Sequence, residues 1–385
     1  MNSFEISKNR EDGIDHASPI PKYLQLQQFL IRQIQSGKYQ AGDKLSTDAE
    51  LKKRFNLSTS TVMRALYELE KAGFITRKQG AGTFLKSAAG APAQSSSFSR
   101  RLLLICGAAP NFDQGHENVN WFIGHEIYRG LVNTFNGRVR ITASEKLAEE
   151  LVSVPPDTQL YVAAVNRRPL IQATLAGRDV PYAIIDQQSQ MPRVTANSVS
   201  LDHVHGVYNA MAYLIEELGH RDVAFIGPGR DELTVQHCGR WSGYCMGLQA
   251  FDLPLRDELL VYAESGSLAD GYRAAQSLLA RKVKFTAVFV TTDLKAIGAI
   301  RAFSEAGLKV PEDISVMGFD DAPGVDQSDP PLTTVRLPYF EAGVAAVKLL
   351  ESAAGPDGMR PGRLLPTRMV LRSSCASVNS CAAAG

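Results

Sequence analysis

The chain has 385 residues, 44% hydrophobic and 21% charged, which is an ordinary composition for a protein of two or three domains. The net charge is only +1, but residues 21–86 carry 12 lysines and arginines against 5 aspartates and glutamates on an otherwise acidic chain. This distribution indicates a polyanionic partner for that segment alone, and no apolar run approaches the length that a membrane span requires.

The five cysteines are odd in number and form no CxxC pair, so reduced, structural thiols are expected. The first residues have no apolar core of a secretory signal. We therefore expect a cytoplasmic protein with no membrane partner.

Residues 1–20 are polar and unpatterned and are expected to form a flexible arm. The first helix follows, with an apolar stripe from Tyr23 to Ile34. A second short helix is predicted within 45–55, because Thr47 and Glu50 have the spacing of a capping box. Asn56 suits a left-handed residue in the tight turn to the next helix. This pair of helices predicts a helix-turn-helix.

The next helix is predicted over 57–69, with Ser58 as its N-cap. Its core-facing stripe consists of Val62, Ala65, Leu66 and Leu69. Its opposite face carries Ser60, Met63, Arg64 and Tyr67. Hydroxyls at the helix start followed by a guanidinium suit insertion into the major groove, although an ordinary surface helix would show a similar face.

Residues 74–85 are predicted to form a hairpin with a glycine-rich tip. Arg77 and Lys78 lie just before the tip, where they would reach phosphates beside the groove. The sequence therefore predicts a winged helix-turn-helix over residues 21–86.

This module resembles the GntR-type winged helix-turn-helix of bacterial transcription factors, on motifs at 36–45, 58–62, 69–75 and 79–84. The resemblance implies binding to double-stranded operator DNA. The chain has Ala49, Thr59 and Met63 where family members often have arginine, which predicts an unusual operator. The expected DNA-binding residues are Thr47, Ser58, Thr59, Ser60, Thr61, Arg64, Arg77, Lys78, Gln79 and Gly80.

Residues 87–99 are small and polar and predict a linker. From residue 100 to 375, short apolar runs alternate with helical stripes. Strands are predicted at 102–106, 139–142, 159–162, 182–185, 223–226, 259–262, 286–290 and 314–317. Helices are predicted at 123–135, 146–152, 170–176, 206–218, 238–249, 268–280, 293–306 and 338–353. This alternation indicates an α/β domain of two doubly wound parallel sheets, the second starting near residue 206, before a flexible tail at 376–385.

The motifs at 218–228, 240–244, 292–299, 310–321 and 331–335 resemble the LacI-type, periplasmic-binding-protein-like effector domain. The resemblance is dense from 199 to 374 and weaker over 101–198. A GntR-type reader joined to a LacI-type sensor is the architecture of regulators of the arabinose repressor kind. It implies a homodimer held by residues 100–375 and a small-molecule effector bound between two lobes.

Ligands of doubly wound folds bind at the carboxyl ends of the strands. Arg240 and Asp293 lie in such positions, and the resemblance places effector contacts on both. Trp121 and Phe122 could stack on a sugar face or a base, and Asp320 could add a contact. Structural alternatives stay open: a salt bridge for Arg240, a helix cap for Asp293, core packing for the aromatic pair, and a turn for Asp320.

The sequence has no P-loop, dinucleotide fingerprint, GxSxG, HExxH or cysteine-rich metal motif, so an enzyme, a cofactor and a metal site are not expected. The predicted function is a transcriptional regulator, and specifically a repressor, whose operator affinity responds to an effector, with a sugar favoured. A nucleoside or purine is the rival effector. A solute-binding protein of the periplasmic type is the alternative class.

Overall fold

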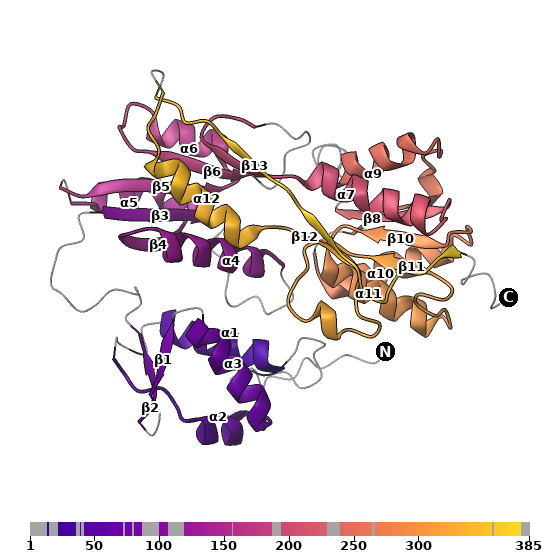
Figure 1. The fold of residues 1–385 in the computed structure, drawn as a ribbon, viewed down its shortest axis with the longest axis horizontal. Helices are drawn as coiled ribbons and strands as arrows, with labels where there is room; N and C mark the ends of the chain where they lie inside the picture. The colour runs from indigo at the N-terminus through magenta and orange to yellow at the C-terminus, as the bar shows by residue number, and fades with distance from the viewer. Residues whose placement is uncertain are drawn as a thin grey trace, which may run out of the picture. The chain divides into compact units, whose positions relative to one another are not determined.

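The computed structural model describes residues 14, 22–35, 39, 42–71, 74–78, 81–86, 100–106, 119–155, 157–186, 194–228, 239–263, 266–355 and 358–378. The chain divides into two compact units, Met1–Ser97 and Phe98–Gly385 (Figure 1). Within the described part of the chain, no helix is long and apolar enough to cross a membrane.

The first unit is a winged helix-turn-helix, as predicted. Its elements are α1 (Lys22–Gln35), α2 (Asp48–Phe55), α3 (Thr59–Lys71), β1 (Ile75–Lys78) and β2 (Gly82–Leu85). One apolar core joins the three helices and the hairpin, and includes Leu26, Leu51, Leu66 and Leu85. The antiparallel register pairs Ile75 with Leu85.

Local hydrogen bonds set the ends of α2 and α3. The N–H of Glu50 donates to Thr47 Oγ1 at 3.3 Å, and the N–H of Thr47 donates to Glu50 Oε2 at 2.8 Å, which completes the predicted capping box. Asn56 ends α2 with φ 49°, the left-handed conformation expected of it. These caps fix the turn that orients α3.

A short extended segment at residues 42–45, which was not predicted, lies beside the wing (the β1–β2 hairpin) and forms an isolated antiparallel bridge between Lys44 and Phe84. The N–H of Gly42 donates to Leu85 O at 2.9 Å, and the N–H of Leu85 donates to Asp43 O at 2.8 Å. The N–H of Leu45 also donates to Thr83 O at 2.9 Å. The segment is too short to show the alternation by which a strand is recognised.

The second unit begins with lobe one, built on a parallel six-stranded sheet in the order β13-β7-β6-β5-β3-β4. Its strands are β3 (Arg100–Cys106), β4 (Arg138–Ala143), β5 (Gln159–Val165), β6 (Tyr182–Asp186), β7 (Ser198–Leu201) and β13 (Arg363–Leu365). Leu102 and Leu104 face one apolar core and Leu103 and Ile105 another, so both faces of the sheet are covered. The helices are α4 (Val119–Thr134) and α12 (Tyr339–Glu351) on one face, and α5 (Leu147–Ser153) and α6 (Arg168–Leu175) on the other.

Lobe two is built on a parallel sheet in the order β11-β10-β8-β9. Its strands are β8 (Val223–Pro228), β9 (Leu260–Ala263), β10 (Ala287–Val290) and β11 (Ser315–Met317). Its helices are α7 (His203–Ala212) and α9 (Gly239–Ala250) on one face, and α10 (Leu268–Ala280) and α11 (Asp293–Glu305) on the other. The predicted fold class, with two parallel-sheet lobes, is confirmed.

The chain crosses between the lobes three times. It passes from β7 into α7, from β12 (Thr334–Arg336) into α12, and from β13 into β14 (Arg368–Val370), which pairs with β12 (Figure 1). The sequence pattern assigned every predicted element after residue 206 to the second lobe, which is wrong for α12, and it did not predict β13. Strands of three or four residues carry too little pattern to reveal these crossings.

The last described residues of the chain, 376–378, form hydrogen bonds to lobe two. His220 is fully buried, with Nδ1 2.9 Å from Thr286 Oγ1 and Nε2 3.0 Å from Ala376 O. The N–H of Val378 donates to Leu218 O at 2.8 Å. Residues 376–378 therefore belong to the fold rather than to the predicted tail, and 379–385 lie outside the described residues.

Candidate functional sites

Helix α3 buries one face and exposes the other, as its spacing predicts. Its buried side chains are Val62, Ala65, Leu66 and Leu69. Its exposed side chains include Ser60, Met63, Arg64 and Tyr67. Met63 is 48% exposed and Tyr67 58%, although both are large and apolar. The exposed face is thus a row of hydroxyl, thioether, guanidinium and phenol groups.

The predicted hydroxyls gather at the start of α3. Ser58 Oγ accepts the N–H of Thr61 at 3.1 Å, and it lies 2.9 Å from Ser60 Oγ. Lys52 Nζ donates to Thr59 Oγ1 at 3.2 Å. This end of the helix combines hydroxyls, an ammonium and the positive end of the helix dipole, which together suit a phosphate.

The guanidinium of Arg64 lies 4.0 Å from the centroid of the Tyr23 ring, which comes from α1. The ring restricts the long side chain, so less conformational entropy is lost when Arg64 binds. Arg64 nevertheless remains on the exposed face of α3.

Polar contacts link the wing, which is the β1–β2 hairpin, to helices α2 and α3. Arg77 Nη2 lies 2.6 Å from Asp48 Oδ2, and the N–H of Arg77 donates to Glu70 Oε1 at 2.8 Å. A phosphate would therefore have to share Arg77 with Asp48.

Lys78 is exposed, with Nζ 5.6 Å from the Phe84 ring centroid. Gln79 and Gly80, two further predicted contacts, lie outside the described residues.

In the second unit, side chains from both lobes meet on one carboxylate. Asp320 directly follows the turn after β11 and is 1% exposed. Its Oδ1 accepts from Arg240 Nη2 at 3.0 Å and from the Tyr339 hydroxyl at 2.9 Å. Arg240 begins α9 in lobe two, and Tyr339 begins α12 in lobe one. The structure thus brings together two of the predicted effector residues, Arg240 and Asp320, and adds Tyr339.

Aromatic rings lie next to Arg240 and Tyr339, the two partners of Asp320. Phe122, in the first turn of α4, packs edge-on against Tyr339 with centroids 6.0 Å apart. The Arg240 guanidinium lies 4.5 Å from the Phe319 ring centroid, and His203 packs edge-on against Phe319. The side chain of Trp121 lies outside the described residues.

Three buried polar atoms here have no hydrogen-bond partner among the described residues: Asp320 Oδ2, Thr292 Oγ1 and His203 Nε2. An unsatisfied buried polar group costs about 1–3 kcal/mol, so such atoms mark a place that a polar ligand would complete. Thr292, His203 and Tyr339 were not predicted as site residues.

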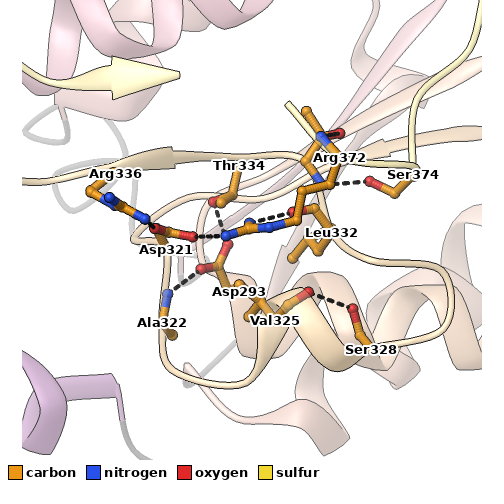
Figure 2. A network of polar contacts seen from close by, with 11 residues as sticks. Asp293, Asp321, Ala322, Val325, Ser328, Leu332, Thr334, Arg336, Arg372 and Ser374 are labelled. Carbon is orange, nitrogen blue, oxygen red and sulfur yellow. Dashed lines mark hydrogen bonds and ion pairs between the residues drawn. The ribbon is translucent and has the colours of Figure 1, made fainter. Parts of the chain in front are cut away.

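Asp293 is fully buried, and Figure 2 shows its polar contacts. Its Oδ1 accepts from the Thr334 hydroxyl at 2.6 Å, and its Oδ2 accepts from the N–H of Ala322 at 2.7 Å. Both oxygens are therefore engaged, one by β12 and the other by the loop that carries Asp320. The predicted contact of Asp293 with an effector stays a prediction, and the geometry favours a positioning role.

The loop after β11 is held from a second side. Asp321 Oδ1 pairs with Arg372 Nη2 at 2.6 Å, and Oδ2 pairs with Arg336 (Figure 2). Asp320 has φ 115° and Asp321 has φ 54°, and residues other than glycine rarely adopt such positive φ values. A backbone held this way at a ligand site is typical of preorganisation.

Burial dominates the electrostatics of this site. It raises the pKa of Asp320, although Arg240 acts in the opposite direction. Burial and the neighbouring Asp320 carboxylate raise the pKa of Asp293 well above its usual range. Burial and then Arg240 lower the pKa of His203, so its imidazole is neutral. The site therefore offers a guanidinium paired with the Asp320 carboxyl group, other donors and acceptors that are neutral, and aromatic rings, which suits a polar molecule with hydroxyl groups.

Comparisons with known proteins agree with this geometry. Residues 22–85 match the family model of bacterial regulatory proteins, gntR family, and residues 212–375 match that of a periplasmic binding protein-like domain. The arabinose metabolism transcriptional repressor of Geobacillus stearothermophilus is 29% identical over 342 residues, 86% of this chain and 90% of that protein. The HTH-type transcriptional repressor PurR of Erwinia tasmaniensis is 39% identical over 45% of this chain, a match that spans about half (49%) of that relative.

Among solved structures, a complex of the transcriptional regulator CelR with cellobiose covers 83% of this chain and 91% of its own, at 22% identity and a TM-score of 0.59. A LacI family transcriptional regulator from Enterococcus faecium with bound ribose covers 72% of this chain and 98% of its own, at 24% identity and a TM-score of 0.56. These likenesses show a shared fold. The chain pairs a gntR-type helix-turn-helix domain with a periplasmic binding protein-like domain.

Proposed function

We propose that this chain is a GntR-family repressor of transcription whose affinity for operator DNA is modulated by a small polar effector. Residues 21–86 would bind the DNA, and residues 100–375 would bind the effector and form the dimer. The observation that carries the proposal is the pairing, in one chain, of a basic winged helix-turn-helix with a buried Arg240–Asp320–Tyr339 contact that joins two lobes.

A sugar is the favoured effector. Arg240 and Asp320 offer a donor and an acceptor side by side, the arrangement that vicinal hydroxyls require. Phe122 and Phe319 supply apolar faces next to them. The relative that this chain covers almost fully is named for arabinose metabolism, and two solved relatives hold cellobiose and ribose. The rival effector, a purine or nucleoside, would use the same groups.

The two-lobed site gives the effector a way to act on distant DNA. Asp320 in lobe two already bonds Tyr339 in lobe one, so a ligand at Asp320 contacts both lobes. A ligand that binds one arrangement of the lobes more tightly shifts the population toward it, and only this difference in affinity can change DNA binding. In this scheme Asp293 positions Asp320, because it holds the N–H of Ala322.

The DNA-binding assignment predicts different effects for two exposed cations. Arg64→Ala should weaken operator binding by roughly 1–3 kcal/mol and relax the preference at one base pair of each half-site. Lys78→Ala should weaken all sequences about equally and reduce the salt dependence, since a phosphate contact carries no sequence information. Binding of the full chain to an operator and its single-base variants measures both. An unchanged base preference in Arg64→Ala would remove α3 from the groove.

We also propose a homodimer, because helix-turn-helix readers use twofold-related half-sites and a single small reader binds weakly. Sedimentation should give twice the mass of the chain at micromolar concentration. Residues 100–385 expressed alone should also sediment as a dimer, with twice the mass of that fragment, because this unit would supply the dimer contact. A monomer in both experiments, with and without operator, would contradict the proposal.

A further inference from the structure

The exposed face of α3 carries two large apolar side chains. Among the described residues, Met63 and Tyr67 are the large hydrophobic side chains of the first unit that are exposed. They lie four positions apart and so share one helix face, with Arg64 beside them. Exposed apolar area is unfavourable in water, so a contiguous patch indicates a binding surface.

The charge of the unit selects the occupant. Residues 21–86 carry a net charge of +7, and Lys52 of α2 donates a hydrogen bond to Thr59 at the hydroxyl-bearing end of α3. A polyanion therefore fits this face better than a second protein surface. Within a major groove, the C5-methyl group of thymine is the apolar feature among the hydrogen-bonding base edges.

Resting on the proposed operator binding, we propose that Met63 is a specificity-determining residue that recognises thymine through its methyl group. Tyr67 extends the same apolar strip by one helical turn. The unbranched thioether adapts its shape to a methyl group and has no donor for guanine O6 or N7. Arg64, restrained by the Tyr23 ring, then supplies the hydrogen-bonding contact next to it.

The experiment removes one methyl group from the DNA and one side chain from the protein. An operator is first selected from random duplexes with the full chain, and each thymine is then replaced in turn by deoxyuridine. At one thymine per half-site, loss of the methyl should weaken binding about fourfold, the equivalent of ~0.8 kcal/mol for one buried methyl-sized group. Met63→Ala should bind the thymine and uracil duplexes equally at that position.

Two variants serve as controls. Met63→Leu keeps an apolar side chain and should keep the sensitivity to the methyl group. Met246→Ala removes a methionine that is 40% exposed in the other unit and should change nothing. The proposal is overturned if no thymine methyl matters to the unaltered chain, or if Met63→Ala remains as sensitive as the unaltered chain. An effect of Met63→Ala on sedimentation without any loss of methyl sensitivity would assign the patch to a protein contact. A selection that enriches no sequence would instead defeat the proposed operator binding itself.

Discussion

Arg240→Ala is expected to abolish the response of operator binding to the effector while the effector-free protein keeps its affinity for the operator. Arg240 lies in the second unit and touches Asp320 and the Phe319 ring, so its loss leaves the DNA-binding unit unchanged. Removal of a charge-assisted hydrogen bond from a buried ligand site costs about 2–5 kcal/mol, which lowers effector affinity by roughly 30-fold or more.

The same substitution also affects folding, and this needs a control. Arg240→Ala leaves the carboxylate of Asp320 buried without its guanidinium, a change that costs about 3–5 kcal/mol. The double variant Arg240→Ala/Asp320→Asn removes the unpaired charge and should regain part of that stability. Effector binding should stay lost in the double variant, because both predicted contacts are gone.

A thermal-shift screen of sugars and nucleosides on the unaltered chain would supply the effector. Operator binding is then titrated with that compound for each variant. A full response in Arg240→Ala would place the effector elsewhere, and loss of operator binding in a folded variant would make Arg240 purely structural. No hit in either class of compound would count against the sensor assignment.

Gly130→Ala is expected to destabilise lobe one by about 3 kcal/mol, whereas Gly124→Ala in the same helix should stabilise it. A Cβ on Gly130 would lie 2.1 Å from Phe340 O and 3.0 Å from Gly343 Cα, both backbone atoms of α12. Backbone of a packed helix cannot move aside, so α4 and α12 would have to separate. At Gly124 a Cβ meets nothing within 4 Å, and alanine gains about 0.5–1 kcal/mol from its higher helix propensity.

Urea unfolding of both variants beside the unaltered chain gives the comparison. The transition that includes lobe one should move to lower urea for Gly130→Ala and to higher urea for Gly124→Ala, with similar slopes. The same sign for both variants would mean that helix propensity, rather than the close approach of α4 and α12, decides stability.

The predictable part of this fold is the part that local chemistry determines. The spacing of Thr47 and Glu50 predicts the start of α2, and Asn56 predicts its end, because helix caps are contacts between residues close in the sequence. The strands and helices predicted for the two lobes lie close to observed elements, but β7, β12, β13 and β14 were not predicted and α12 was assigned to the wrong lobe. The register of β13 with β7 joins residues more than 160 positions apart, and no local pattern encodes it.

The proposed effector site shows the same limit. Asp293 and Asp320 both follow a buried strand of lobe two, so the sequence offers each of them as a contact. The structure separates their roles, since Asp293 is engaged by Thr334 and Ala322 while Asp320 keeps a buried oxygen without a partner among the described residues. Tyr339 was seen only as a residue of a helical stripe. Its place beside Asp320 follows from the return of α12 to lobe one.

The threefold crossing of the chain also sets the order in which the protein can be completed on the ribosome. The DNA-binding unit is contiguous and is finished early, whereas lobe one waits for α12 and β13 at residues 339–365. At about 5–20 residues per second, the nascent α4 would expose its apolar face for roughly 10–50 s before its partner helix is synthesised. Translation therefore produces a complete DNA-binding unit attached to an incomplete second unit. We expect chaperones to bind the nascent chain mainly in that interval.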